Sequence, residues 1–279
     1  MIKDHLWVPF ELVLKEMLDV CPRGLHTHMF FELVYIVAGT GRQSINDLKF
    51  SYKAGDLFLV APEDKHIFYI EKTTQFFFIR FNNIFVQSNE KEKAFFQRLE
   101  MILENASHEP GRIIKDEEDA NLICKLMEML IQEHLRDNLY GRELIIQLVN
   151  SALVIIARNI NQSFPKQIDE NTDNKAIEIL QYIQSNIYFP EKLRANKISK
   201  QFGISQSYLG SYFKKHANVS MQQYILSYKL KLVEERLLHS DKRISEIADE
   251  LGFADKSHLN HLFKKYKGIT PTAFKKIQF

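Results

Sequence analysis

A pattern that occurs twice near the C-terminus constrains the fold of this chain more than any other feature. Each copy has a short apolar-periodic segment that ends at a glycine, then a brief turn, then a second segment that ends in Phe-Lys-Lys. The first copy reads ISKQFG at 198–203 with FKK at 213–215, and the second reads IADELG at 247–252 with FKK at 263–265. The copies lie about fifty residues apart, which indicates a duplicated structural unit.

Local signals within each copy predict two helices separated by a turn. Gly203 and Gly252 stand where a helix stops in the left-handed conformation, and Ser205 and Asp255 are suitable N-caps for the helices that follow. We therefore predict two helix-turn-helix units, at about 191–216 and 243–267. The second helix of such a unit enters the major groove of DNA. The alternative is a pair of ordinary helical hairpins, which would not require two copies in register.

The charge distribution indicates a polyanionic partner for the same region. From Lys175 to the C-terminus the chain has 18 Lys and Arg against 9 Asp and Glu, a net charge of +9. The rest of the chain carries 19 against 26, a net charge of −7, so the overall value of +2 conceals a basic segment and an acidic one. Such a division is typical of a chain in which one part binds a polyanion.

The 279 residues are enough for two domains, each with a core of its own. Between about 25 and 85, short β-branched and aromatic runs predict a small antiparallel barrel or sandwich. Turns are expected at Gly39-Thr40-Gly41, Asn46-Asp47 and Ala54-Gly55-Asp56. After about residue 90 the period becomes helical, and 163–174 is polar and breaks the helix, which is typical of an interdomain linker.

Two apolar stripes in the helical region are expected to bury the helices against the barrel, and one of them can also form a dimer interface. The stripes are Leu122, Leu126, Met129 and Leu130, and Leu144, Leu148, Ala152 and Ile155.

Several classes of protein are disfavoured by the sequence. No apolar run approaches the ~20 residues that a membrane-spanning helix requires, and the N-terminus has no signal-peptide pattern. Cys21 and Cys124 lie far apart without metal-type spacing, which predicts a reduced, cytoplasmic setting. No Ser-His-Asp pattern, phosphate loop or paired acidic motif is present, so we expect no catalytic residues, no cofactor and no membrane partner.

A group of polar residues in the barrel region indicates a binding site. His26, His28 and Glu32 share one face of a strand by parity, and His66 is a candidate fourth member. Such a set suits a divalent transition metal, a metal-free pocket for a small molecule, or structural histidines, and we expect the metal-free pocket. The apolar N-terminal arm with Trp7 is expected to close over this pocket or to touch the basic domain, and Phe10 belongs to the same arm.

The histidine spacing resembles the first motif of the cupin superfamily. The second motif is matched less well, because Asp64 stands where a glycine is usual and His66 arrives one residue early. This resemblance leaves an alternative function open, a metal-dependent cupin enzyme with an accessory DNA-binding domain.

Over Ile198–Phe274, and most strongly over Ile244–Pro271, the chain resembles the DNA-binding domain of the AraC/XylS family of bacterial transcription regulators. The N-terminal part resembles that family's cupin-like effector domain. The resemblance implies an α+β chain with a cupin-like antiparallel barrel and flanking helices at 1–162, a linker at 163–174, and an all-α DNA-binding domain at 175–279. It also implies a sequence-specific regulator of transcription, an activator more than a repressor. Its partners would be double-stranded DNA, a small-molecule effector, RNA polymerase and a second copy of the chain.

On each recognition helix, the face opposite the buried Leu and Phe is free to contact DNA. The residues expected at base edges are Gln206, Ser207, Gly210 and Ser211 in the first unit, and Lys256, Ser257, Asn260 and His261 in the second. The residues expected at phosphates are Lys214, Lys215, Lys264 and Lys265. Many relatives carry arginine at the Ser211 and His261 positions. Serine and histidine cannot make its forked contact to guanine, whereas Asn260 can read adenine.

A helix predicted from Val219 to about His239 joins the two units. Its length of roughly 30 Å approaches the ~34 Å of one DNA turn, so it can place two recognition helices one turn apart. Tyr224, Tyr228 and Leu232 form the stripe by which this helix is expected to pack on both units.

Overall fold

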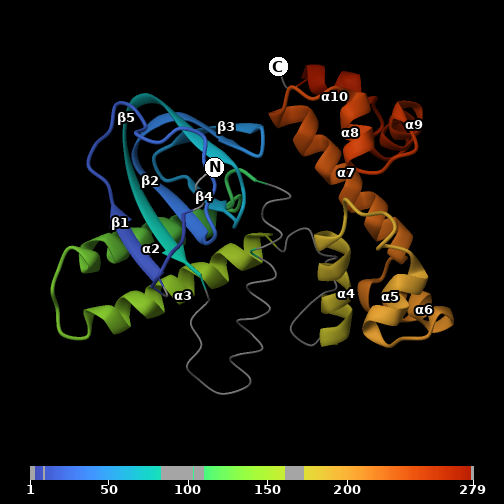
Figure 1. Ribbon diagram of the computed structural model, residues 1–279, viewed down its shortest axis with the longest axis horizontal. Coiled ribbons are helices and arrows are strands. Elements are labelled where there is room, and N and C mark those ends of the chain that lie inside the picture. Colours follow the sequence, from blue (N-terminus) through green and yellow to red (C-terminus); the bar gives the residue numbers. More distant parts are fainter. Residues whose placement is uncertain (1–3, 9, 83–102, 104–109, 161–172, 278–279) are drawn as a thin grey trace. The chain divides into compact units, whose positions relative to one another are not determined.

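The protein divides into two compact units, Met1–Asn161 and Gln162–Phe279, each with its own hydrophobic core. The computed structural model describes residues 4–8, 10–82, 103, 110–160 and 173–277 (Figure 1). Of the linker predicted at 163–174, only Asp173 and Asn174 are among the described residues, and the rest lies outside them.

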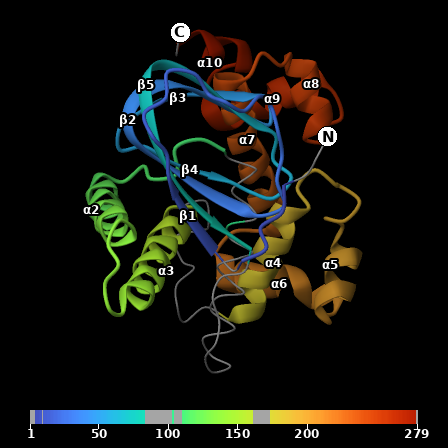
Figure 2. The same cartoon turned by 60° about the vertical axis from the view of Figure 1, so that its left-hand side comes forward.

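Among the described residues, five antiparallel strands form the sheet of the N-terminal unit. They are β1 (Phe10–Leu14), β2 (Phe31–Ile45), β3 (Leu48–Lys53), β4 (Leu57–Val60) and β5 (His66–Phe81). The hydrogen-bonded order is β1-β5-β2-β3, and β4 pairs with β2. The long strands β2 and β5 bend along their length and curl the sheet around an interior (Figures 1 and 2). The predicted antiparallel β-domain is confirmed.

The turns between strands were only partly predicted. Asn46 and Asp47 have φ of 49° and 66° and connect β2 to β3 in a two-residue hairpin, as expected. The turn expected at Gly39–Gly41 is wrong, because β2 continues through it. A Cβ on Gly39 would lie 2.4 Å from the carbonyl oxygen of Thr73, so this glycine allows β5 to approach β2 closely at an irregularity in the register.

The two faces of the sheet have different roles. On β2, Leu33 and Tyr35 pack in one core with the helices α2 (Glu117–His134) and α3 (Gly141–Ile160), whereas Val34 and Ile36 pack in the interior of the curled sheet. This alternation is what strand geometry requires of a sheet with both faces covered. Figure 2 shows α2 and α3 side by side on one side of the sheet.

The first apolar stripe predicted in the helical region is wrong in part. On α2 the buried apolar residues are Ile123, Met127 and Leu130, while Leu122 and Met129 are exposed. The helix carries two adjacent apolar stripes. The sheet covers the stripe of Ile123, Met127 and Leu130, and leaves Leu122 and Met129 exposed. On α3 the second predicted stripe is buried at Leu148, Ala152 and Ile155, and its first member, Leu144, is exposed.

Helix α3 also contradicts the expectation that no apolar run approaches the length of a membrane span. Gly141–Ile160 is 20 residues long and apolar enough to cross a membrane by length and composition. The same test is passed by core helices, and α3 buries Val149, Leu153 and Ile156 completely in the core that it shares with the sheet. We therefore interpret α3 as a core helix of this unit.

In its described residues, 173–277, the C-terminal unit has helices and no strand, as predicted. Its helices are α4 (Asn174–Ser185), α5 (Ala195–Phe202), α6 (Gln206–Ala217), α7 (Met221–His239), α8 (Ile244–Glu250), α9 (Lys256–Lys267) and α10 (Pro271–Ile277). The central helix α7 begins in a capping box formed by Ser220 and Gln223. It buries Tyr224, Tyr228 and Leu232, the predicted stripe, in the core of the unit.

The pairs α5–α6 and α8–α9 are the two helix-turn-helix units. Gly203 ends α5 in the left-handed conformation with a φ of 62°, and Gly252 follows α8 with a φ of 64°. Asp255 caps α9 by accepting a hydrogen bond from the backbone N–H of His258 at 2.7 Å. Ser205 occupies the N-cap position of α6, but its side chain makes no capping bond to the helix.

Candidate functional site

Helix α6 presents a polar face of small residues away from the core. Leu209 and Phe213 are buried, because they close the space between α6 and the rest of the unit. The four predicted base-reading residues of this helix are all exposed: Gln206, Ser207, Gly210 and Ser211. No atom lies within 4 Å of the position that a Cβ on Gly210 would occupy, so this part of the helix surface is open.

Helix α9 presents a larger and more basic face. Leu259 and Phe263 are buried, and the exposed residues on the opposite side include Lys256, Ser257 and His261. Asn260 is only half-buried, and its Oδ1 atom is buried without a hydrogen-bond partner. Buried polar atoms are normally paired, so the Asn260 amide has hydrogen-bonding capacity that this structure does not use.

The last turns of the two recognition helices carry exposed cations. Lys214 and Lys215 on α6, and Lys264 and Lys265 on α9, are exposed. Lysine is a flexible point charge that suits phosphate better than a specific base edge. The 19 residues of α7 give a rod of about 28 Å between the two units.

A cavity of about 640 Å³ lies in the N-terminal unit, a volume within the usual range for small-molecule sites. Its apolar wall includes Leu6, Trp7, Val8, Leu18, Phe30, Phe68, Phe76 and Phe78, and its polar wall includes Asp4, Glu11, Lys15, Arg23, His26, Glu32, His66 and Arg80.

A row of three charged side chains crosses the wall of the cavity. The strand register places Glu11 of β1, Arg80 of β5 and Glu32 of β2 side by side. Arg80 donates from Nε to Glu32 Oε1 at 2.8 Å and from Nη1 to Glu11 Oε2 at 3.0 Å. Its guanidinium also lies over the rings of Phe30 and Phe78, at 5.8 and 5.3 Å. One cation therefore pairs with both carboxylates.

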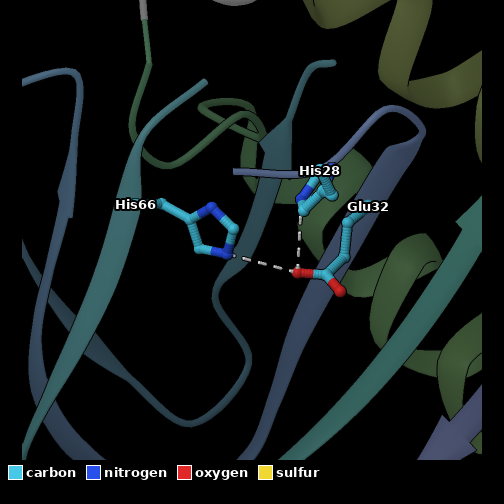
Figure 3. Close-up of side chains that lie close together, drawn as sticks. All are labelled: His28, Glu32 and His66. Atoms are coloured by element: carbon cyan, nitrogen blue, oxygen red, sulfur yellow. Dashed lines mark ion pairs between the residues drawn. The ribbon is translucent and has the colours of Figure 1, made fainter. Parts of the chain in front are cut away.

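The second oxygen of Glu32 faces two imidazoles (Figure 3). Glu32 Oε2 lies 3.8 Å from His28 Nε2 and 3.5 Å from His66 Nε2, longer than usual hydrogen bonds. All three side chains are buried. Among the described residues, neither ring nitrogen of His28 has a hydrogen-bond partner of good geometry, and neither does Nδ1 of His66. His28 and His66 therefore have unused ring nitrogens beside Glu32, and of the three residues Glu32 and His66 line the cavity.

The protonation states follow from burial and from these contacts. Burial lowers the pKa of His28 to about 4, so its imidazole is neutral at pH 7. Burial alone would raise the pKa of Glu32, but the facing His66, His28 and Arg80 outweigh it and hold the pKa at about 2. Burial and the neighbouring His66 also lower the pKa of His26. At neutral pH this end of the cavity contains an ionised carboxylate paired with a guanidinium, beside neutral His28.

Comparison with protein-family models assigns both units. Residues 16–149 match the AraC-like ligand binding domain, and residues 198–277 match a helix-turn-helix domain. The chain belongs to the AraC family. It is a ligand-responsive, DNA-binding transcription regulator, as the sequence predicted.

Relatives of similar length support the assignment to the AraC family. The Msm operon regulatory protein of Streptococcus mutans is 25% identical over 245 residues, which cover 87% of this chain and 82% of that protein. The HTH-type transcriptional activator RhaS of Escherichia fergusonii is 26% identical over 251 residues, covering 88% and 85%. These relatives are regulators, and they give no support to the alternative of a cupin enzyme.

The chain is also similar to solved structures, over most of its length in one case and over its C-terminal part in another. ToxT from Vibrio cholerae matches 97% of this chain and 99% of its own at 12% identity, with a TM-score of 0.36. The C-terminal domain of the two-component response regulator yesN from Fusobacterium nucleatum matches 37% of this chain and 99% of its own at 29% identity, with a TM-score of 0.34.

The cupin-like character of this AraC-family domain raises the question of a bound metal. The ligand atoms of His28, Glu32 and His66 lie within 4.8 Å of one another, and their chemistry suits a divalent transition metal. However, Arg80 already places a permanent positive charge against the same carboxylate, which disfavours a second cation there. The donor set therefore fits an uncharged hydrogen-bonding ligand better, and a metal-free site stays a prediction.

The predicted cavity residues are brought together, although not by the predicted geometry. Strand β2 begins only at Phe31, so His26 and His28 precede it and do not share a continuous strand with Glu32. His28, Glu32 and His66 form the buried group. His26 is half-buried at its edge, where its ring lies 4.2 Å from that of His66 and its Nδ1 donates to the Gly24 carbonyl at 2.8 Å.

Sequence reasoning missed Arg80 and Glu11. A signal for Arg80 was present, because it is a charged residue inside the otherwise apolar run Phe76–Phe81. The expectation for the N-terminal arm is also revised: Trp7 lines the cavity, but Phe10 belongs to β1 and packs against the core of the unit.

Proposed function

We propose that the protein is an activator that places α6 and α9 in successive major-groove segments on one face of the DNA. The observation that carries this proposal is the pair of polar recognition faces joined by the rod of α7, with exposed lysines at the end of each recognition helix. One turn of B-DNA is about 34 Å long, which is close to the length of the rod. The activating role is supported by the relatives named as activators.

Footprinting of the full chain on DNA that flanks its own gene tests this proposal. The expected result is protection of two segments about one helical turn apart, on one face of the duplex. A fragment from Lys175 to Phe279 should protect the same segments if the helical unit carries the reading function. Uniform, salt-sensitive protection without discrete segments would contradict sequence-specific reading.

Single substitutions on α9 separate base reading from phosphate binding. Asn260→Ala is expected to reduce discrimination between the protected site and random DNA by about 1–3 kcal/mol, because asparagine can bond the adenine edge. Lys265→Ala is expected to weaken binding to both DNAs alike. It should also reduce the slope of log K against the logarithm of the salt concentration by about one. Titrations at several salt concentrations measure both effects. Equal losses on specific and random DNA with Asn260→Ala would contradict its base-reading role.

The effector is proposed to bind in the cavity of the N-terminal unit. Arg80 pairs with Glu32 and Glu11, and Arg23 pairs with Asp4. With Lys15, three cations face three carboxylates in the lining, so the cavity holds matched charges. A small uncharged compound that hydrogen-bonds to His66 and Glu32, which both line the cavity, and packs its apolar part against the aromatic wall, suits this environment.

The remaining partners belong to the same proposal. Leu122, Leu126 and Met129 form an apolar stripe on α2 that the sheet leaves largely uncovered, which supports a homodimer of the regulator. An activator on DNA would also contact RNA polymerase. Binding to DNA and to RNA polymerase would place the protein in the cytoplasm.

Light scattering of the wild type and of Leu122→Glu tests the stripe on α2: a dimer is expected for the wild type and a monomer for the variant. An unchanged mass would remove the support that the stripe gives.

A further inference from the structure

A cluster of polar groups around the buried Arg236 joins the two helix-turn-helix units of the C-terminal domain. Arg236, near the end of α7, is only 5% exposed. Its Nε donates to Glu250 Oε1 of α8 at 3.0 Å, and its Nη2 donates to Tyr188 Oη at 2.7 Å. Lys242 Nζ donates to the other oxygen of Glu250 at 2.6 Å. The guanidinium of α7 thus bonds groups from two other segments, the α4–α5 connection and α8.

The segments that Arg236 joins belong to different reading units. Tyr188 lies in the connection from α4 to α5 and therefore leads directly into the first unit, whereas Glu250 is the last residue of α8 in the second. Arg236 itself stands on the helix between them. Because a guanidinium presents its donors in a fixed planar fork, contacts to two partners constrain their relative direction as well as their distance.

A tight apolar contact joins the same two segments beside this cluster. A Cβ on Gly252, in the turn of the second unit, would lie 2.5 Å from Pro190 Cγ in the connection that enters the first. Lys229 of α7 lies next to this contact, with its Nζ 5.6 Å from the ring centroid of Phe253. A polar link and a close packing contact therefore tie the same two segments together.

We infer that Tyr188, Pro190, Arg236, Glu250 and Gly252 form an inter-unit clamp that fixes α9 relative to α6 and so makes the protein select the spacing of its two DNA segments. The inference rests on the proposed function, because it concerns how both recognition helices engage one duplex. The clamp residues are positioning residues and contact no base. An ion pair with a buried or partly buried partner is weak evidence for stability, so the expected effect of the clamp is on spacing more than on folding.

The test uses a site that the wild-type full chain selects from a random double-stranded DNA library. One base pair is then inserted or deleted between the two protected segments, which rotates one segment against the other by about 35°. A rigid reader should bind these spacing variants at least about tenfold more weakly than the selected site. We define the spacing ratio as the Kd for a spacing variant divided by the Kd for the selected site. Two variants should each reduce this ratio at least about threefold. They are Tyr188→Phe, which removes only the bonded hydroxyl, and Gly252→Ala, which drives a methyl group against Pro190.

Gly203→Ala is the matched control for Gly252→Ala. Both glycines have nearly the same positive φ, 62° and 64°, so alanine strains the backbone equally at either position. No atom lies within 4 Å of a Cβ on Gly203, whereas Pro190 obstructs one on Gly252. Gly203→Ala should therefore keep the wild-type spacing ratio. The double variant Gly252→Ala, Pro190→Ala should recover much of it.

The outcomes separate the clamp from the proposed function. If the library yields no preferred site, the proposal of a sequence-specific double reader fails, and the clamp fails with it. If a site is selected but Tyr188→Phe keeps the full spacing ratio of the wild type, the clamp is overturned while the reading function stands. Should Gly252→Ala not fold, as judged by its thermal unfolding, Tyr188→Phe decides the matter alone. A spacing ratio that falls equally in Gly203→Ala would assign the effect to backbone strain and also overturn the clamp.

Discussion

Replacing Arg80 by methionine is expected to destabilise the N-terminal domain by about 3–5 kcal/mol, because it leaves a buried carboxylate without its cation. Glu32 is 4% exposed, and Arg80 is bonded to it at 2.8 Å. The pKa of Glu32, now held at about 2, should rise once the guanidinium is gone. Urea unfolding of the full chain at pH 7 measures the loss, and hydrogen exchange of β2 and β5 assigns the transition to this domain.

An exposed ion pair in the same sheet provides the control for Arg80→Met. Arg42 pairs with Glu71 at 2.9 Å, but these side chains are 60% and 52% exposed. Arg42→Met should therefore cost less than about 1 kcal/mol. The double variant Arg80→Met, Glu32→Gln should be more stable than Arg80→Met alone, since it removes the unpaired charge. Losses below 1 kcal/mol in both single variants would show that Glu32 does not depend on Arg80.

The helical domain was predictable because its signals are local. The period of the apolar residues, the glycine at the end of α5 and the cap at Asp255 each act within one or two turns of helix. Whether a recognition-helix residue faces outward also follows from the 3.6-residue period, and the exposed Ser207 and Ser211 agree with it. The inter-unit clamp was not predictable, since Arg236 and Tyr188 are separated by 48 residues.

The sheet domain was harder to predict because its decisive contacts are distant in sequence. Arg80 meets partners 48 and 69 residues away, so only the strand register reveals its role. Gly39 looks like a turn residue locally, whereas its function is to allow β5 to approach β2. On α2, Ile123 and Leu122 are equally apolar, and only the position of the sheet decides which of them is buried. Local patterns therefore identified the elements of this domain but not their faces.

Acidification is expected to destabilise the N-terminal domain between pH 7 and pH 5, and His28 should account for much of the effect. The pKa of His28 in the folded protein is about 4, below its ordinary value of 6.5, because burial disfavours the charged imidazole. In this window the unfolded chain binds more protons than the folded one, so the free energy of unfolding falls as the pH falls. The contribution of His28 amounts to about 2 kcal/mol by pH 5.

The groups that face His28 do not reverse this expectation. The carboxylate of Glu32 attracts a proton to the imidazole, but His66 and His26 oppose protonation, and burial outweighs the attraction. Glu32 itself stays ionised, since its pKa is about 2, and its own contribution to the free energy of unfolding is lost only below about pH 4.5.

Urea unfolding of the full chain at pH 7, 6 and 5 should therefore show a shallower pH dependence in His28→Gln than in the wild type. His134→Gln, at an exposed histidine of α2, is the control and should retain the wild-type slope. If His28→Gln also retained it, the pKa of His28 would have to be nearly the same in the folded and unfolded chain, and the lowering of this pKa by burial would be wrong.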